Sequence, residues 1–376
     1  MNKLIRRYHQ LKMIPLLAIS KVLSIFQKEK YWVLHERGTD ARDNAYFFYC
    51  YLKKKHPKQK VYYIIDKNTP DYHKVKADAV HLGSLKNYWA IATAEKIIST
   101  HCFFGLPYMN PKLFRFCGLN RKFYFLQHGI TGNFVSQMHF ENSKINMLFC
   151  AAKPEYDYML RKYGYPEENV RLTGFARYDT LHNNKTQKQI LIMPTWRMYI
   201  GDESDFLASK YYQRWNQLLE DPRLAAYLEK NQLTAVFYPH FEIQKYLHKF
   251  QPGTDRIVLA DFSSFDVQTL LKESALLITD YSSVFFDFAY MRKPVVYFQF
   301  DFEEFFSKHY SRGYFCYEEM GFGPVAEDVD AVIDDITRCA NNGFVPESMY
   351  EHRMDMFFPL YDQKNCERIY QCITEK

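Results

Sequence analysis

The sequence predicts an α/β protein with two doubly wound halves. Short runs rich in Val, Ile, Leu and Phe alternate with helical stretches through nearly all of its 376 residues, as expected for parallel strands covered on both faces. A polar, non-periodic segment at His182–Lys188 separates two strand-rich halves and marks a domain boundary. Hydrophobic residues make up 47% of the chain and charged residues 24%, a globular composition with enough apolar material for a sizeable core in each half.

Apolar runs give the expected strands. In the first half they are Tyr31–His35, Val61–Ile65, Ala79–Leu82, Lys96–Ser99, Lys122–Gln127 and Met147–Ala151, and in the second half Gln189–Met193, Leu233–Tyr238, Arg256–Leu259, Leu276–Thr279 and Val295–Phe300. Such runs are typical of buried parallel strands. The helices expected between and after them are Asn44–Lys55, Pro154–Tyr163, Lys210–Lys230, Ser264–Glu273, Asp328–Ala340 and Tyr361–Ile373.

The segment Ala275–Phe298 combines a strand, a polar turn, a helix and a second strand. After the first strand, Asp280, Ser282 and Ser283 offer side-chain oxygens where the helix begins, and Pro294 stops the helix. Free backbone N–H groups and the helix dipole favour a phosphate at such a position. An ordinary N-cap would use the same residues, so the pattern leaves a phosphate site and a simple cap open.

Further polar residues follow three other predicted strands, where ligands bind in open parallel sheets. His128 precedes Gly129, and its imidazole titrates near neutrality, which suits a general base; a structural histidine is the alternative. Arg197 offers a planar fork of donors for a diphosphate, with Thr195 as an added hydroxyl, or else lies at a domain interface. His240 can donate a hydrogen bond to a phosphate and steady a departing nucleotide.

Four short segments at these strand ends occur in a fixed order. They are LQHGI (126–130), MPTWR (193–197), FYPHF (237–241) and TDYSS (279–283), the last followed by a Phe-rich helix and KPVVYF (293–298). Together they resemble the CDP-glycerol glycerophosphotransferase family, which contains teichoic acid primases and polymerases. The usual His-Gly-Thr of that family reads His-Gly-Ile-Thr here, and its Arg-x-His-Pro reads Tyr-Pro-His-Phe.

Two doubly wound halves with a cleft between them match the GT-B arrangement, and the resemblance implies the same GT-B-like fold of two Rossmann-like domains with an interdomain cleft. The residues of the N-terminal segment add an amphipathic helix to this fold. It implies that a base activates the acceptor while other groups hold the nucleotide. The implied catalytic residues are His128, His240 and Arg197, and the implied nucleotide-binding residues are Thr195, Asp280, Ser282 and Ser283.

The implied activity is transfer of glycerol phosphate, or another polyol phosphate, from a CDP-activated donor to a hydroxyl group with release of CMP. CDP-glycerol and CDP-ribitol are the expected donors. The expected acceptor is a lipid-linked or polymeric polyol phosphate, such as a teichoic acid or a capsular polymer. A GT-B glycosyltransferase that uses a nucleotide sugar is the alternative enzyme. A non-catalytic, membrane-peripheral module that binds an acidic polymer is the alternative from another class.

A polar cluster, Glu36–Asn44, follows the first predicted strand and begins a helix. Arg37 and Arg42 could hold an acceptor phosphate, whereas Asp43 or Asn44 could cap the helix. Capping alone is the simpler interpretation, because these residue types are common wherever a helix begins.

The first thirty residues interleave cations with apolar side chains. The longest uncharged stretch, Met13–Ser20, is too short to span a bilayer, so an amphipathic helix on the cytoplasmic face of the membrane is expected, with a helix packed on the protein body as the alternative. The expected organisation is a membrane-associating segment (1–30), an acceptor-side domain (31–185), a donor-binding domain (186–350) and a helix packing back towards the first domain (351–376).

Several function classes lack support in the sequence. A net charge of +6 suits nucleotides, acidic polymers or anionic lipids but is too small to indicate nucleic acid. GxGxxG, Walker A and HExxH motifs are missing, and the eight cysteines lack metal-ligand spacing. We therefore expect no nucleic-acid partner, no cofactor and no metal site, and we expect the cysteines to be free thiols in a reducing cytosol.

Overall fold

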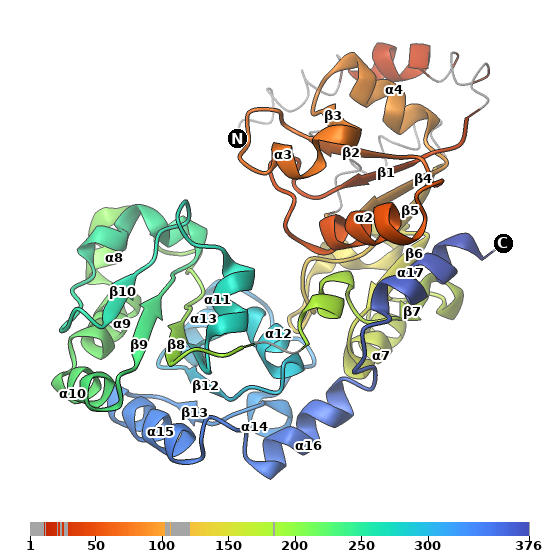
Figure 1. The fold of residues 1–376 in the computed structure, drawn as a ribbon. Coiled ribbons are helices and arrows are strands. Elements are labelled where there is room, and N and C mark those ends of the chain that lie inside the picture. The colour runs from red at the N-terminus through yellow and green to blue at the C-terminus, as the bar shows by residue number, and fades with distance from the viewer. Residues whose placement is uncertain are drawn as a thin grey trace. The chain divides into compact units, whose positions relative to one another are not determined.

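The computed structural model describes residues 11, 13–20, 22, 25, 29–101, 106, 121–182 and 185–375. The chain divides into two compact units (Figure 1). The first unit takes in the chain as far as Ile130, Ser136–Thr180 and the chain from Asp362 onward. The second takes in Thr131–Val135 and Leu181–Tyr361. Each unit is built around one parallel sheet.

The sheet of the first unit has the strand order β3-β2-β1-β4-β5-β6-β7. Every neighbouring pair is parallel, and the register of β1 on β4 pairs Trp32 with Lys96 and His35 with Ser99. This order is doubly wound, because the chain builds outward from β1 to one edge and then returns to build outward from β4. The strands are β1 (Trp32–His35), β2 (Val61–Ile65), β3 (Ala79–His81), β4 (Lys96–Ser99), β5 (Lys122–Phe125), β6 (Met147–Cys150) and β7 (Val170–Leu172).

Helices connect and cover these strands. The longest, α2, begins after Asp43, whose carboxylate accepts from the Asn44 backbone N–H at 2.7 Å, while the Glu36 carboxylate accepts from the Tyr46 backbone N–H at 2.9 Å. Both bonds satisfy donors that the first turn of a helix leaves open. The helices of this unit are α2 (Asn44–Lys55), α3 (Tyr72–Val75), η2 (Lys76–Asp78), α4 (Leu85–Thr93), η3 (Ser136–Met138), α6 (Phe140–Ser143), α7 (Lys153–Arg161), η4 (Glu167–Asn169), η5 (Ala176–Thr180) and α17 (Asn365–Thr374).

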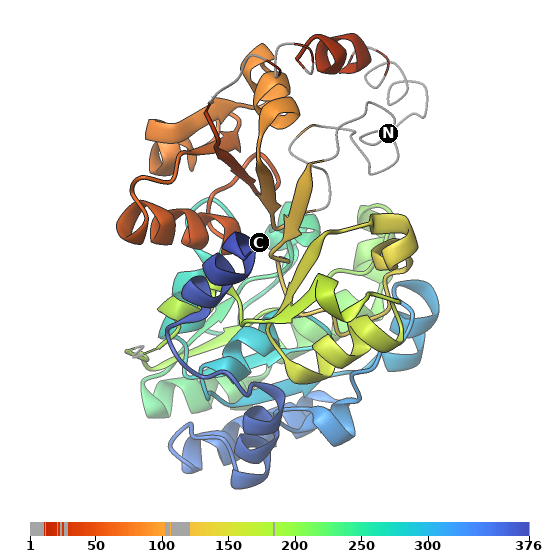
Figure 2. The ribbon, with the colours of Figure 1, turned by 90° about the vertical axis from the view of Figure 1, so that its right-hand side faces the viewer.

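The C-terminal helix α17 belongs to the first unit, where Figure 2 shows it (blue) beside α2 (red). Its side chains Cys366, Ile369 and Ile373 are buried in the core of that unit. The Asp179 carboxylate on η5 accepts hydrogen bonds from the backbone N–H groups of residues 365 and 366 at 2.8 and 2.9 Å. These bonds satisfy donors that the first turn of a helix leaves open, so they fix where α17 starts.

Most of the predicted amphipathic segment 1–30 lies outside the described residues. Residues 13–20 are helical, with Met13 and Leu17 buried at 2% and 0% exposure and Ile19 exposed at 59%. One face of this helix therefore packs on the protein and another does not. Among the residues that the structure describes, no helix has both the length and the apolar character needed to cross a membrane.

The sheet of the second unit has the strand order β10-β9-β8-β11-β12-β13, and all of its pairs are parallel. It repeats the doubly wound plan, with β8 and β11 at the centre. The strands are β8 (Gln189–Ile192), β9 (Thr234–Phe237), β10 (Ile257–Leu259), β11 (Leu276–Thr279), β12 (Val295–Phe298) and β13 (Val325–Ala326). The helices are α8 (Glu203–Ala208), α9 (Lys210–Glu220), α10 (Pro222–Asn231), η6 (Phe241–Lys249), α11 (Val267–Glu273), α12 (Val284–Tyr290), α13 (Phe302–Lys308), α14 (Tyr317–Met320), α15 (Val329–Asn341) and α16 (Ser348–Phe357).

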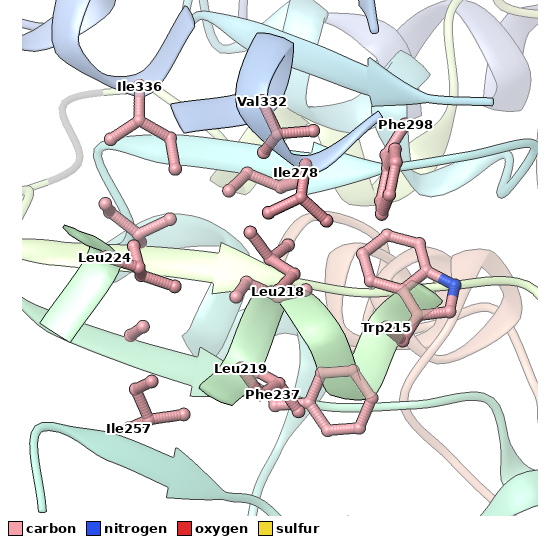
Figure 3. Close-up of a cluster of buried hydrophobic side chains, with 14 of the residues drawn as sticks. Trp215, Leu218, Leu219, Leu224, Phe237, Ile257, Ile278, Phe298, Val332 and Ile336 are labelled. Carbon is pink, nitrogen blue, oxygen red and sulfur yellow. The ribbon is translucent and has the colours of Figure 1, made fainter. Parts of the chain in front are cut away.

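A hydrophobic core lies between this sheet and the helices on one of its faces (Figure 3). Trp215 and Leu218 of α9 and Val332 of α15 point towards Ile278 and Phe298 on the strands. All five side chains are at 0% exposure. Burying a side chain of this size contributes about 1.5–3 kcal/mol to the free energy of folding. This layer therefore stabilises the sheet whose carboxyl ends carry the loops of the candidate site.

Two of the differences between the structure and the predicted elements have a clear physical reason. The predicted helix Lys210–Lys230 is broken into α9 and α10, because Asp221 caps a new helix and Pro222 opens it. The strands β7 and β13 were not predicted. Both are short edge strands, and a two- or three-residue segment carries too little apolar pattern to be recognised.

Candidate functional site

The carboxyl ends of the central strands define the candidate site in each unit. In a doubly wound sheet the loops diverge between the two central strands, and ligands bind in the crevice beyond them. These strands are β1 and β4 in the first unit and β8 and β11 in the second. The loops that follow them carry His101 after β4, Thr195 and Arg197 after β8, and Asp280 after β11.

His128 stands on a strained turn after β5. Its neighbour Gln127 is buried and has a φ of 57°, a left-handed conformation that costs a non-glycine residue energy. The buried Asn44 amide donates to the Gln127 carbonyl at 2.8 Å, and the Gln127 side chain donates to the Phe149 carbonyl at 2.8 Å. Both side chains thus fix the turn from opposite ends, and His128 is presented with its side chain exposed.

The His128 ring is oriented by a backbone hydrogen bond and by a second histidine. One ring nitrogen bonds to the Thr100 carbonyl, and the ring stacks on His101 with 5.0 Å between centroids and 18° between planes. Desolvation by the surrounding protein, followed by the positive charges of Arg37 and Arg177, lowers the pKa of His128 below its ordinary value. The imidazole is therefore neutral at neutral pH and has a lone pair available to accept a proton.

His101 is held neutral as well. Its Nε2 accepts a hydrogen bond from Arg37 Nε at 3.3 Å, so the ring proton is on Nδ1, which lies 2.9 Å from Thr100 Oγ1. Burial, followed by the nearby His128 and Arg37, lowers the pKa of His101 to about 2. His101 was not among the predicted site residues, although it lies two positions beyond the predicted strand Lys96–Ser99, and that position was the available signal.

The polar cluster Glu36–Asn44 has separate functions for its members. Asp43 caps α2 and also pairs with Arg177 of η5 at 2.9 Å. Arg42 pairs with the buried Asp71 carboxylate at 2.6 Å. The capping interpretation is therefore confirmed for Asp43, and Arg42 is occupied by an internal ion pair.

In the second unit, Arg197 lies in a buried network of internal partners. Its side chain has 0% exposure, its Nε and Nη2 donate to the Asp301 carboxylate at 2.7 and 3.0 Å, and its Nη2 pairs with Asp280 at 2.9 Å. Its Nη1 donates to the Thr195 carbonyl at 2.6 Å. The guanidinium thus binds internal partners on the loops after β8, β11 and β12, and a contact with the diphosphate stays a prediction.

Asp280 is the centre of the same buried network. Its Oδ1 accepts from the backbone N–H of Thr195 at 2.8 Å and of Tyr281 at 2.6 Å. Burial raises the pKa of Asp280, and the charge of Arg197 opposes that shift. The carboxylate is at 0% exposure and joins the loop after β8 to the loop after β11, so it helps to fix the positions of both loops.

The hydroxyl groups of Thr195, Ser282 and Ser283 near this network differ in their exposure. Thr195 is 8% exposed, and its Oγ1 has no hydrogen-bond partner among the residues that the structure describes. Ser282 is half-buried and Ser283 is exposed at the start of α12, where it makes no side-chain capping bond. The side chains of the two serines thus make no capping hydrogen bond. The buried Thr195 hydroxyl lacks a partner among the described residues, and a ligand could supply one.

His240 is exposed after β9 and begins η6, where its Nδ1 accepts from the Glu242 N–H at 3.3 Å. Its ring stacks on Trp196 with 5.8 Å between centroids and 15° between planes, and Trp196 also contacts His309 edge-on at 5.1 Å. The sequence analysis missed both Trp196 and His309. Trp196 lies inside the recognised MPTWR segment, whereas His309 follows α13 and has no sequence signal that connects it to the site.

Comparisons with known proteins agree with the motifs. The family model of CDP-glycerol:poly(glycerophosphate) glycerophosphotransferases matches residues 17–375. The minor teichoic acid biosynthesis protein GgaB of Bacillus subtilis is 35% identical over 374 residues, which cover 95% of this chain and 41% of GgaB. The teichoic acid poly(glycerol phosphate) polymerase of Bacillus spizizenii is 25% identical over 381 residues, which cover 90% of this chain and 91% of the polymerase. The chain therefore spans less than half of the first relative and nine-tenths of the second.

Among solved structures, the wall teichoic acid polymerase TagF superposes with a TM-score of 0.71 at 18% identity, covering 99% of this chain and 98% of that chain. At this identity the likeness bears on the fold alone. Together with the two parallel sheets, it confirms the predicted GT-B-like class of two Rossmann-like α/β domains.

Proposed function

Because the chain belongs to the CDP-glycerol:poly(glycerophosphate) glycerophosphotransferase family, we propose that it transfers glycerol phosphate from CDP-glycerol to an acceptor hydroxyl and releases CMP. The observation that carries the proposal is His128, a neutral, exposed imidazole fixed on a strained turn in the family's His-Gly segment. A strained, well-supported backbone at such a point is typical of functional sites.

In the proposed reaction, His128 accepts the proton of the acceptor hydroxyl. The acceptor oxygen forms a bond to the donor phosphorus that carries glycerol, and the bond from that phosphorus to the bridging oxygen breaks. The bridging oxygen leaves with CMP. Phosphoryl transfer of this kind depends mainly on positioning the reactants and on stabilising the charge of the transferred group. We assign the donor to the second unit, because that unit carries the candidate phosphate-binding residues.

The donor-binding groups in this proposal are Thr195, Ser282, Ser283 and His240. Thr195 is supported by its buried, unpartnered hydroxyl, and Ser283 by its exposed place at the start of α12. His240 has an exposed ring that Trp196 supports from one face. Arg197 acts indirectly, because it holds Asp280 and Asp301 and thereby keeps the loops after β8, β11 and β12 in place.

The proposed acceptor is a polyol phosphate polymer or its lipid-linked precursor, as the names of the relatives suggest for those proteins. CDP-ribitol is kept as a second donor, because ribitol-phosphate polymerases are also among the relatives.

The experiment that tests the function is a donor screen with product analysis. The purified protein is incubated with CDP-glycerol, CDP-ribitol and a set of nucleotide sugars, together with a short glycerol phosphate oligomer. We expect CMP and an elongated oligomer with a CDP-polyol, and a higher KM for that donor in Thr195→Val and Ser282→Ala. Release of UDP or CDP from a sugar donor would support a glycosyltransferase instead, and no turnover of any donor would support a binding module.

A second proposal concerns the membrane surface. Leu11, Ile19 and Val22 are exposed at 67%, 59% and 60%, on a helical segment whose other face is buried. Exposed apolar side chains on a helix in a cation-rich segment suit the interface of an anionic bilayer. We propose that this exposed face contacts the cytoplasmic surface of the membrane.

The double variant Ile19→Ser/Val22→Ser is expected to bind anionic liposomes about tenfold more weakly with an unchanged melting temperature, because exposed apolar area is lost. Cosedimentation with vesicles at low and high salt measures this. Met13→Ser serves as the contrast, since Met13 is 2% exposed and its loss should lower the melting temperature instead. Equal liposome binding by the double variant and the parent protein would reject the membrane proposal.

A further inference from the structure

We propose that Arg37 is an anion-binding residue of the acceptor site, which holds a phosphate group of the acceptor beside His128. This inference rests on the proposed function and names the substrate class that the first unit recognises, a hydroxyl acceptor that already carries phosphate. The charges around the carboxyl ends of β1 and β4 support it.

Arg37 differs from the two arginines near it. Arg42 is paired with Asp71 at 2.6 Å and Arg177 with Asp43 at 2.9 Å, whereas Arg37 has no ion pair with a carboxylate among the described residues. Its guanidinium makes one hydrogen bond there, from Nε to a neutral histidine, and leaves Nη1 and Nη2 available. These two groups form the edge of the guanidinium fork that suits a phosphate.

Arg37 is also exposed, so it can reach a ligand. On its own loop, Asp40 accepts a hydrogen bond from the Arg37 backbone N–H at 3.3 Å. The charge of Arg37 also acts on the Asp40 carboxylate, where it opposes the burial that raises the Asp40 pKa, but the two side chains form no ion pair among the described residues. An exposed arginine with an open fork at the switch point of a doubly wound sheet lies where ligands of this fold bind.

The contact between Arg37 and His101 ties this cation to the base. Arg37 Nε lies 3.3 Å from His101 Nε2, and His101 stacks on His128 at 5.0 Å. In a polyol phosphate chain the free hydroxyl lies only a few bonds from the nearest phosphate. A phosphate held by the outer edge of Arg37 therefore places that hydroxyl near His128, and an acceptor without phosphate lacks this guide.

The bound phosphate also changes the charge around His128. The groups that face its ring are Arg37 after β1, His101 and the Thr100 carbonyl after β4, and Arg177 of η5, which Asp43 already pairs. Arg37 disfavours protonation of His128 in the free enzyme. A phosphate on Arg37 offsets that charge, so the ring becomes a stronger base when the acceptor is bound.

The test compares Arg37→Gln with the parent on two acceptors, a short glycerol phosphate oligomer and glycerol itself, with CDP-glycerol as donor. We expect kcat/KM for the oligomer to fall by about 10- to 100-fold, the effect of losing charge-assisted hydrogen bonds, and kcat/KM for glycerol to stay within a few-fold. Arg161→Gln, which removes an exposed arginine of α7 in the same unit, is the matched control. Arg37→Lys should recover part of the loss.

A pH profile gives a readout that a structural role would not move. As the pH falls, kcat of the parent should begin to drop at a higher pH than kcat/KM does. The reason is that kcat reports the complex, in which bound phosphate raises the pKa of His128, whereas kcat/KM reports the free enzyme. In Arg37→Gln the two acid limbs should converge, with that of kcat/KM moved to higher pH.

A second measurement tests the inference even if Arg37→Gln folds poorly. Titration of the parent and of Arg37→Lys with inorganic phosphate should shift the NMR signals and raise the pKa of His128 in both proteins. An unchanged His128 signal in the parent, or an equal loss on both acceptors in Arg37→Gln, would overturn the inference. If the parent does not turn over CDP-glycerol at all, the proposed function is contradicted. In that case the phosphate titration still tests whether Arg37 binds an anion beside His128.

Discussion

His128→Ala is expected to lower the rate of transfer by about 100- to 10,000-fold, the usual cost of removing a general base. Affinity for CDP-glycerol should remain close to that of the parent protein, because the donor is assigned to the second unit. The fold should also persist, since the His128 side chain is exposed and the turn beneath it is fixed by Asn44 and Gln127. Single-turnover kinetics with a glycerol phosphate oligomer and calorimetry with CDP-glycerol measure the two quantities.

Two comparisons sharpen this result. His73→Ala, at an exposed histidine of α3 in the same unit, should leave the rate unchanged. In the parent protein, kcat/KM should stay high to a pH below 6.5, because the lowered pKa of His128 keeps the base form populated there. A His128→Ala protein that transfers within a few-fold of the parent rate would remove His128 from the mechanism.

Arg197→Ala is expected to destabilise the second unit strongly. The change leaves the carboxylates of Asp280 and Asp301 buried without their cation, and breaking a buried pair in this way costs about 3–5 kcal/mol. That is a large part of the 5–15 kcal/mol that typically holds a domain folded. Arg197 also lies over the rings of Tyr211, Tyr281 and Phe305, at 5.2, 5.0 and 4.9 Å, so packing is lost with the charge.

Thermal and urea unfolding measure this effect. Arg223→Ala is the contrast, because that arginine is exposed and its ion pairs with Asp221 and Asp330 are screened by solvent, so the melting temperature should change little. If Arg197→Ala kept the melting temperature of the parent and lost only affinity for CDP-glycerol, the arginine would contact the diphosphate, as the sequence suggests. The buried geometry predicts loss of stability first, with any loss of donor affinity following from displaced loops.

The strands of both sheets could be predicted from the sequence because buried parallel strands are continuous apolar runs. Lys96–Ser99 and Leu276–Thr279 were predicted with the observed bounds, whereas Lys210–Lys230 was predicted as one helix and forms two. Apolar spacing continues across Asp221 and Pro222, so the periodic pattern hid a break that the cap and the proline impose.

Residue types at strand ends were enough to select His128, Thr195, Asp280 and His240 as candidates, because the doubly wound pattern tells where ligands bind. Their surroundings were not available from the same pattern. Whether a strand-end side chain faces a ligand or an internal partner depends on residues distant in the chain, and Asp301 lies more than a hundred positions from Arg197.

By itself, the sequence determined the fold class, the family and the order of the motifs, since these depend on local apolar runs and on short segments. Only the tertiary structure decided the role of each charge. It buried Arg197 between two carboxylates, paired Arg42 and Arg177, and left Arg37 open beside the stacked rings of His101 and His128. The physical reason is that an ion pair and its desolvation are set by the distance between groups in space, which the spacing of residues along the chain does not contain.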